Sequence, residues 1–134
     1  MNKHVYINFK QFSRVKKPNN YLLAPKSYCL SSTVDEFSPV LNVGIKILYR
    51  LMKEIMVSLP RTVKVFEDEQ RYQLHYVQRS FLCRFPDIIY LQLISLNEQQ
   101  STLLIYSAAC YGYSDFGVNK KRVRHILHRL SREC

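Results

Sequence analysis

The stretch RYQLHYVQR (residues 71–79) alternates in the way expected of a β-strand: Tyr72, Leu74 and Tyr76 fall on one face, His75 and Val77 on the other. Similar strand-like runs lie before and after it, at TVKVF (62–66), DIIYLQLIS (87–95) and STLLIYSAA (101–109). Short polar turns such as EDEQ (67–70) separate them. Because these connections are short, the sequence predicts four strands joined as antiparallel hairpins.

Two amphipathic helices flank these strands. Between residues 41 and 58 apolar side chains recur at steps of three and four, and Pro60 bounds the run. Residues 118–130 repeat the pattern, with one apolar stripe formed by Val123, Ile126, Leu127 and Leu130. The order helix, four strands, helix predicts a two-layer α+β fold, with both helices packed on one face of an antiparallel sheet.

The first 24 residues are expected to form a basic N-terminal arm or a short strand. Val5, Ile7 and Phe9 alternate with polar residues, so this run either adds a fifth strand to the sheet or stays extended. The segment SRVKKPNNYLLAPKS (13–27) contains two prolines and paired asparagines, which predicts irregular structure. We therefore expect a single globular domain over residues 25–134.

Composition and charge layout limit the classes of function. A chain of 134 residues with 47% hydrophobic residues can bury a core and is not disordered. Its net charge of +10 lies at the two ends, because residues 1–26 carry +6, residues 27–116 carry −1 and residues 117–134 carry +5. Such ends attract nucleic acid, anionic lipid or an acidic protein over ~8 Å at physiological salt, or simply keep the domain soluble.

The sequence shows no targeting or membrane-spanning segment. The first residues, MNKHVYINFKQF, lack the apolar stretch of a secretory signal peptide. The longest apolar candidate, residues 40–59, is interrupted at helical spacing by Lys46, Arg50, Lys53 and Glu54. We expect a cytoplasmic protein without a transmembrane segment, and we leave peripheral membrane association open.

Neither a metal nor a cofactor is expected. None of the four cysteines forms a C-x-x-C pair, so a zinc ribbon or finger is not indicated. His125 and His128 lie three residues apart on the last helix, but Arg124 and Arg129 beside them repel a cation. A solvated helix face explains this pair better than a metal site does.

Four short blocks resemble the pattern of a known family. CLSS (29–32) matches its C-V-S-S, Leu74, His75 and Ser80 match its L-H and serine, and FPDIIY (85–90) matches F-x-D-D-V-E. The longest block, YSAACYGYSDFGVNKKR (106–122), matches R-S-A-S-R-x-G-Y-S-D-L-G-V-N-R-x-R. On these blocks, residues 25–130 resemble a divergent member of the bacterial and plastid family catalogued as domain of unknown function fourteen ninety-nine. The resemblance implies no activity; its motif residues are Ser80, Asp87, Ser107, Gly112, Asp115, Gly117 and Asn119.

This chain departs from the family pattern at five charged positions. Tyr106 and Cys110 stand where the pattern has arginines, and Val77, Ile88 and Tyr90 stand where it has acids. The two-residue period of a strand suggests that the family's charges face each other on the sheet. Because the arginines and the acids are replaced together, no buried charge is left without a partner. We therefore expect Tyr90 and Tyr106 to share one face of the sheet.

Cys29 and His75 are the candidates for catalysis. A thiol just before a helix has its thiolate favoured, and His75 is the one histidine within the matched blocks that can serve as a base. A single cysteine and a single histidine at unknown distance more often mean a buried thiol and a sheet histidine. An enzyme with a Cys29/His75 site is therefore the alternative hypothesis.

The cations of the last helix, Lys120, Lys121, Arg122 and Arg124, are the candidates for anion binding. Tyr111 and Tyr113 can stack on a base, although no known nucleic-acid motif matches. We expect a non-catalytic binding module for an anionic or protein partner. A structural subunit of a larger assembly is the third hypothesis.

Overall fold

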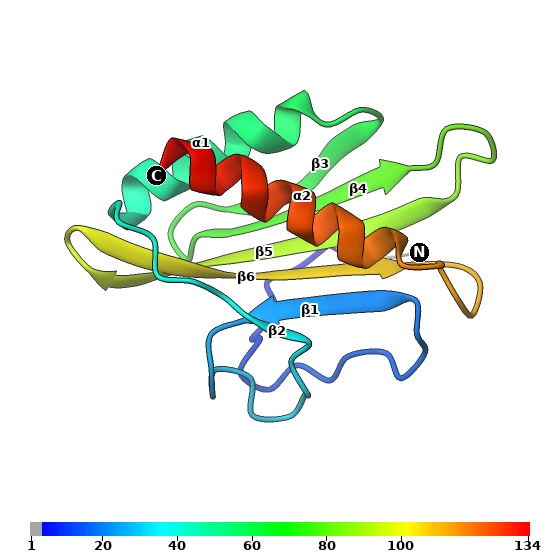
Figure 1. Cartoon of the computed structure of the whole chain (residues 1–134), viewed down its shortest axis with the longest axis horizontal. Coiled ribbons are helices and arrows are strands. Elements are labelled where there is room, and N and C mark those ends of the chain that lie inside the picture. The colour runs from blue at the N-terminus through cyan, green and yellow to red at the C-terminus, as the bar shows by residue number, and fades with distance from the viewer. Residues whose placement is uncertain (1–3) are drawn as a thin grey trace.

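The alternating runs in the middle of the chain fold as consecutive antiparallel hairpins. In the computed structural model, which describes residues 4–134, they form β3 (Thr62–Asp68), β4 (Gln73–Arg79), β5 (Pro86–Asn97) and β6 (Gln100–Ala109). Each pairs antiparallel with the next. With helices α1 (Ile45–Ser58) and α2 (Val118–Glu133) these strands give the predicted α+β class (Figure 1).

The sheet is larger than predicted and is mixed. Two further strands, β1 (Asn20–Ala24) and β2 (Glu36–Phe37), extend it in the order β2-β1-β6-β5-β4-β3. β1 runs antiparallel to β6, whereas β2 runs parallel to β1. The four predicted strands are antiparallel, as expected, but the prediction of a sheet of four or five strands, all antiparallel, is wrong, because the sheet has six strands and β2 is parallel to β1. β1 escaped prediction because it is buried on both faces and does not alternate, and β2 is too short to show a pattern.

Both helices pack on the same face of the sheet. α1 begins at Ile45, after Gly44, rather than near residue 41, and α2 continues to Glu133. Figure 1 shows the two helices side by side over the strands. They share one apolar cluster with the sheet, which includes Leu48, Met52, Ile55, Leu91, Leu103, Val123, Ile126 and Leu130.

The opposite face of the sheet is covered by the N-terminal segment. Phe9 is buried there against Leu104 and Tyr106, and Phe12 packs edge-on against Tyr106 with ring centroids 4.9 Å apart. The segment forms no ladder at residues 4–19. Instead, Ile7 exchanges hydrogen bonds of 2.8 Å with the side chain of Gln73, so the expected strand at Val5–Phe9 is an extended segment.

Candidate functional site

Cys29 and His75 lie in environments that oppose an activated thiol–imidazole pair. Burial raises the pKa of the Cys29 thiol. His75 is buried between Phe66 and Tyr90, and this burial, with a smaller contribution from His4, lowers its pKa to about 4. Its Nε2 donates to Gln73 Oε1, and no hydrogen bond among the described residues joins it to Cys29. Both side chains are therefore held neutral.

The expected common face for Tyr90 and Tyr106 is confirmed. The two residues are direct partners in the β5–β6 register, and their ring centroids lie 6.1 Å apart. Ile88 pairs with Val77 on this face, and Cys110 follows β6 and donates its amide to Pro86. The positions at which the chain departs from the family pattern thus lie along one face of the sheet.

Most of the family motif residues meet in one buried polar network under the start of α2. Arg122 donates to Asp87, Ser107 and Asn119 through Nη1, at 2.9, 3.0 and 2.7 Å, and to Gln78 through Nε. The Asn119 amide in turn donates to the Asn19 carbonyl and to Asp115. Since these groups satisfy one another, the network joins α2 to β4, β5 and β6 as a structural device.

The charge states in this network are set by burial and by hydrogen bonds. Burial raises the pKa of Asp87, and the guanidinium of Arg122 partly offsets that effect. Burial also acts on Asp115, but donors from Asn119 and Gly117 outweigh it and hold that pKa below its ordinary value. Asp115 thereby accepts hydrogen bonds from the backbone amides of Gly117 and Asn119, at the start of α2.

The remaining motif residues shape two loops. Ser80 and Phe85 exchange hydrogen bonds of 3.0 Å that close the loop between β4 and β5. Gly112 and Gly117 both have positive φ, at 86° and 82°, a region in which other residues are strained. The Gly112 carbonyl accepts a hydrogen bond from the Asn19 side chain, which fixes the loop between β6 and α2.

Two of the four cations predicted to bind an anion form ion pairs within the described residues, and two do not. Arg122 is committed to the network, and Arg124 reaches Glu36 at 3.5 Å. Lys120 and Lys121 are exposed, and neither forms an ion pair with any residue in the described range 4–134. Of the four predicted cations, Lys120 and Lys121 are therefore the two without an ion pair among the described residues.

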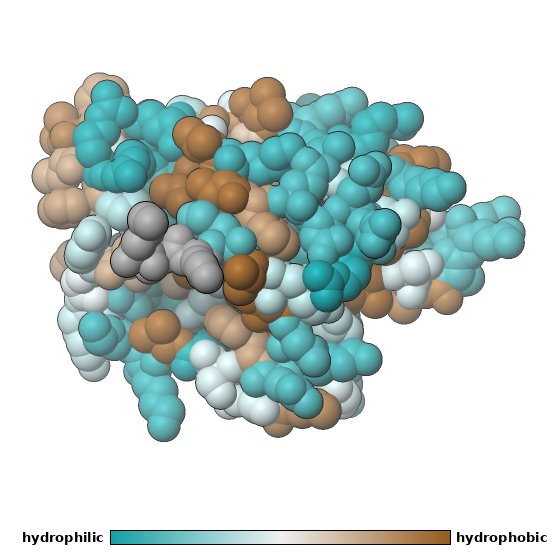
Figure 2. Space-filling view, turned by 180° about the vertical axis from the view of Figure 1, so that it is seen from behind, coloured by the Kyte–Doolittle hydropathy of each residue, from teal (hydrophilic) through white to brown (hydrophobic). Residues whose placement is uncertain are grey.

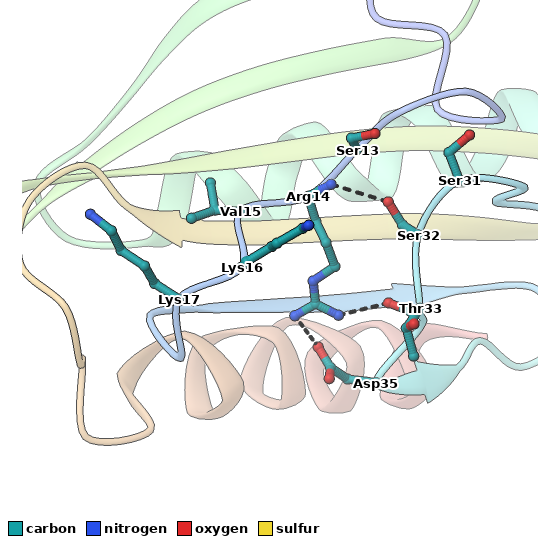
Figure 3. Close-up of a pocket in the computed structure, with 9 residues that line it drawn as sticks. All are labelled: Ser13, Arg14, Val15, Lys16, Lys17, Ser31, Ser32, Thr33 and Asp35. Carbon is teal, nitrogen blue, oxygen red and sulfur yellow. Dashed lines mark hydrogen bonds and ion pairs between the residues drawn. The ribbon is translucent and has the colours of Figure 1, made fainter.

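A surface cavity near the CLSS block is lined by an internal ion pair between Arg14 and Asp35. Figure 3 shows Arg14 pointing toward Asp35 and the Thr33 carbonyl, and Ser32 accepting from the Arg14 amide. Asp35 also accepts from the Leu22 amide at 2.9 Å. Asp35 therefore compensates the charge of Arg14. Through Asp35 the ion pair also connects the N-terminal segment to β1.

Two loops project together from one end of the sheet. Residues 80–85 connect β4 to β5 and residues 110–117 connect β6 to α2, and both extend to the right in Figure 1. Phe85 contacts Tyr111 across the two loops, with ring centroids 6.3 Å apart. We call their exposed apolar side chains the hydrophobic tip; it consists of Phe81, Leu82, Phe85, Tyr111, Tyr113 and Phe116.

A cavity of about 480 Å³ lies beside this tip, and we call it the arginine cavity. Its apolar lining comes from Val63, Val65, Val77 and Ile88, and its cations are Arg61 and Arg79. No Asp or Glu of the described chain lines it. Val77, Ile88 and Cys110, three of the five positions that differ from the family pattern, contribute to its wall.

Sequence reasoning missed this end of the molecule. Arg61 and Arg79 lie in the stretch 27–116 whose charges cancel, so counting along the chain concealed them. Folding separates them from the acids of that stretch, since Glu67 and Asp68 pair with Lys64 and Arg71 on other parts of the surface. The run FLCRF (81–85), with four apolar residues in a loop, was the available signal.

Comparison with known proteins confirms the resemblance seen in the motif blocks. No curated protein matches the chain. The family model described as "Protein of unknown function (DUF1499)" matches residues 23–130, which include every strand except the first part of β1 and nearly all of both helices. The chain therefore belongs to the DUF1499 family of proteins of unknown function.

Proposed function

We propose that this protein is a non-catalytic binding module for an anionic partner, and that the partner's charge is received at the arginine cavity. The proposal rests on one observation: two arginine side chains lie together without a carboxylate beside them. Arg61 and Arg79 line the same cavity, and no carboxylate within residues 4–134 lines it with them.

The two guanidinium groups retain hydrogen-bonding capacity. Arg61 Nε donates to the Arg79 carbonyl at 2.9 Å, and Arg79 Nη1 donates to the Arg84 carbonyl at 3.0 Å. A guanidinium has five N–H donors, so most of them are left for a carboxylate or phosphate. An anion placed between the two groups also relieves their mutual repulsion.

A binding role fits this site better than catalysis does. Burial raises the pKa of the Cys29 thiol and lowers that of His75 to about 4, which makes the imidazole a weak base, and its Nε2 is bonded to Gln73 rather than to Cys29. Lys120 and Lys121, exposed on the first turn of α2, supply further positive charge. A cytoplasmic location remains a prediction from the sequence.

Isothermal titration with inositol hexakisphosphate, a compact polyanion without apolar groups, tests the proposal. The double variant Arg61→Gln/Arg79→Gln is expected to lose at least about tenfold in affinity, because each charged hydrogen bond contributes about 1.5–3 kcal/mol. Raising the salt from about 50 to about 200 mM is expected to weaken binding of the wild type steeply.

The matched control is Lys26→Gln/Lys46→Gln, which removes the same charge from two exposed lysines elsewhere. It should bind within about twofold of the wild type, because distant exposed charges are screened. Equal loss in both double variants would show that net charge alone governs binding and would contradict a site at the arginine cavity.

A further inference from the structure

The hydrophobic tip has no covering partner within residues 4–134. Phe116 is 92% exposed and Leu82 is 84% exposed, and the other four side chains of the tip are also exposed. Figure 2 views the molecule from behind and shows brown side chains on the upper part of its left edge, the side on which the loop between β4 and β5 projects. Large exposed apolar side chains gathered at one end of a molecule mark interaction surfaces.

We propose that the tip docks the protein on the surface of an anionic lipid bilayer. The inference rests on the proposed function and names its partner: the arginine cavity and the neighbouring cations receive lipid headgroups, while the tip side chains enter the boundary between headgroups and acyl chains. Amphipathic elements at this depth bury their apolar side chains ~5–10 Å into the membrane interface.

The loops hold their apolar side chains outward by local hydrogen bonds. Ser80 and Phe85 close the first loop, and Asp115 and Gly112 fix the second. The Phe85–Tyr111 contact joins the two loops into one surface. Preorganised loops lose little conformational freedom on docking. The entropic cost of binding through the tip is therefore small.

The residue types suit a membrane interface. Phe81, Leu82 and Phe116 are apolar throughout, whereas Tyr111 and Tyr113 combine an apolar ring with a hydroxyl. Tyrosine is enriched at the headgroup level of membranes for this reason. Because the tip is formed by projecting loops and not by a groove, it fits a deformable surface better than a single extended peptide.

Charge complementarity favours an anionic surface. The guanidinium of Arg61 lies 5.6 Å from the centre of the Phe81 ring, so a cation sits directly beside an apolar tip residue. Arg79 and Arg84 lie in or next to the first loop, and Lys120 and Lys121 follow the second. Of the two acids of this end, Asp87 is paired with Arg122, and Asp115 accepts hydrogen bonds from the amides of Gly117 and Asn119.

The same charges disfavour a second copy of this chain as the occupant. A symmetric pair meeting through the tip would bring Arg61, Arg79 and Arg84 of both copies together without a free carboxylate between them. A lipid surface instead supplies the negative charge, and each cation near it adds about fivefold to binding, from about 1 kcal/mol per Lys or Arg.

Sedimentation with lipid vesicles tests the inference. The wild type is expected to bind vesicles of phosphatidylcholine mixed with phosphatidylserine and to bind pure phosphatidylcholine at least about tenfold more weakly, because several cations contribute. Phe81→Ser/Leu82→Ser should lose at least about tenfold in binding to the mixed vesicles, since two large apolar side chains no longer insert. The matched control, Leu30→Ser/Phe37→Ser, changes the same residue types at exposed positions away from the tip and should bind as the wild type does.

Folding of each variant is checked by circular dichroism and thermal melting. Phe116→Ser gives a second, independent test, because a side chain that is 92% exposed contributes little to the fold. It should reduce vesicle binding about threefold or more and leave the melting temperature unchanged. Unchanged vesicle binding by folded Phe116→Ser and by the Phe81→Ser/Leu82→Ser variant overturns the inference.

The outcomes separate this inference from the proposed function. Retained binding of inositol hexakisphosphate with no binding to mixed vesicles overturns membrane docking and leaves the anion site intact. If the wild type binds neither inositol hexakisphosphate nor mixed vesicles, the anion site and membrane docking are both overturned. Equal binding to neutral and mixed vesicles overturns the role of charge, and tip-dependent self-association without vesicle binding assigns the tip to a protein interface instead.

Discussion

Arg122 and Asp87 form an ion pair between α2 and β5, with Nη1 2.9 Å from Oδ2 and both side chains largely buried. The pair lies inside the network that also includes Ser107 and Asn119. Its position shows why a basic sequence run does not by itself define a binding surface. The third cation of KKRVR (120–124) serves to fasten a helix to the sheet.

Replacing Arg122 by Met is expected to destabilise the protein by about 3 kcal/mol, because Asp87 is left as a buried carboxylate without a partner. Urea unfolding followed by circular dichroism measures this loss. Arg124→Met is the matched control, since Arg124 is 57% exposed in its pair with Glu36 and should cost less than about 1 kcal/mol. Similar costs for the two variants would contradict a structural role for the network.

Restoring the family's charges at Tyr90 and Tyr106 tests whether those positions can form a pair. Tyr106 is 1% exposed and faces Tyr90 directly, so Tyr106→Arg alone places an unpaired cation in the sheet at a cost of several kcal/mol, about 3–5. Adding Tyr90→Glu should recover more than about 1 kcal/mol of that loss. A double-mutant cycle in urea measures the coupling. Strictly additive effects would show that the two positions do not interact.

His75 makes stability depend on pH. Burial lowers its pKa from 6.5 to about 4, so between these values the unfolded chain binds a proton that the folded chain does not. The free energy of unfolding must therefore fall as the pH falls from 6.5 toward 4, by up to about 3 kcal/mol for this group. Above pH 6.5 the contribution is constant.

His75→Phe is expected to remove this part of the pH dependence. The ring keeps its place between Phe66 and Tyr90, and the buried Nδ1, which finds no partner within residues 4–134, disappears. Urea midpoints at pH 7, 6, 5 and about 4.5 compare the two chains. Carboxylates such as Glu67, whose pKa is lowered to about 2 by Lys64 and Tyr49, titrate in both chains, so the difference between the curves isolates the histidine. Parallel curves would show that His75 is not buried in the neutral form.

The hairpins of the sheet were predictable because their signal is local. In β4, Leu74 and Tyr76 face the helices and His75 and Val77 the opposite face, and short polar turns set the strand's direction, although Tyr72 itself lies in the turn before β4. β1 was not predictable in this way. Asn20 and Leu22 belong to a segment rich in proline and asparagine, and their strand exists because β6 lies beside it, a partner far along the chain.

The candidate site was less predictable for a related reason. Asp87, Ser107 and Asn119 could be selected from the motif blocks, but their convergence on Arg122 depends on how α2 crosses the sheet. Arg61 and Arg79 carry no motif, and their place in one cavity follows from the pairing of β3 with β4, across which the Arg79 amide donates to the Arg61 carbonyl.

The covering of the second sheet face by the N-terminal segment has a consequence for the order of assembly. The Val15 amide donates to the hydroxyl of Tyr106, 91 residues further along the chain, and Ile7 pairs with Gln73, 66 residues away. Contacts of such separation carry a high loop-closure entropy, so they form after the local hairpins. During synthesis the N-terminal segment can complete its cover only after β6, the last strand of the sheet, has emerged, and until then Tyr90 and His75 lack that cover.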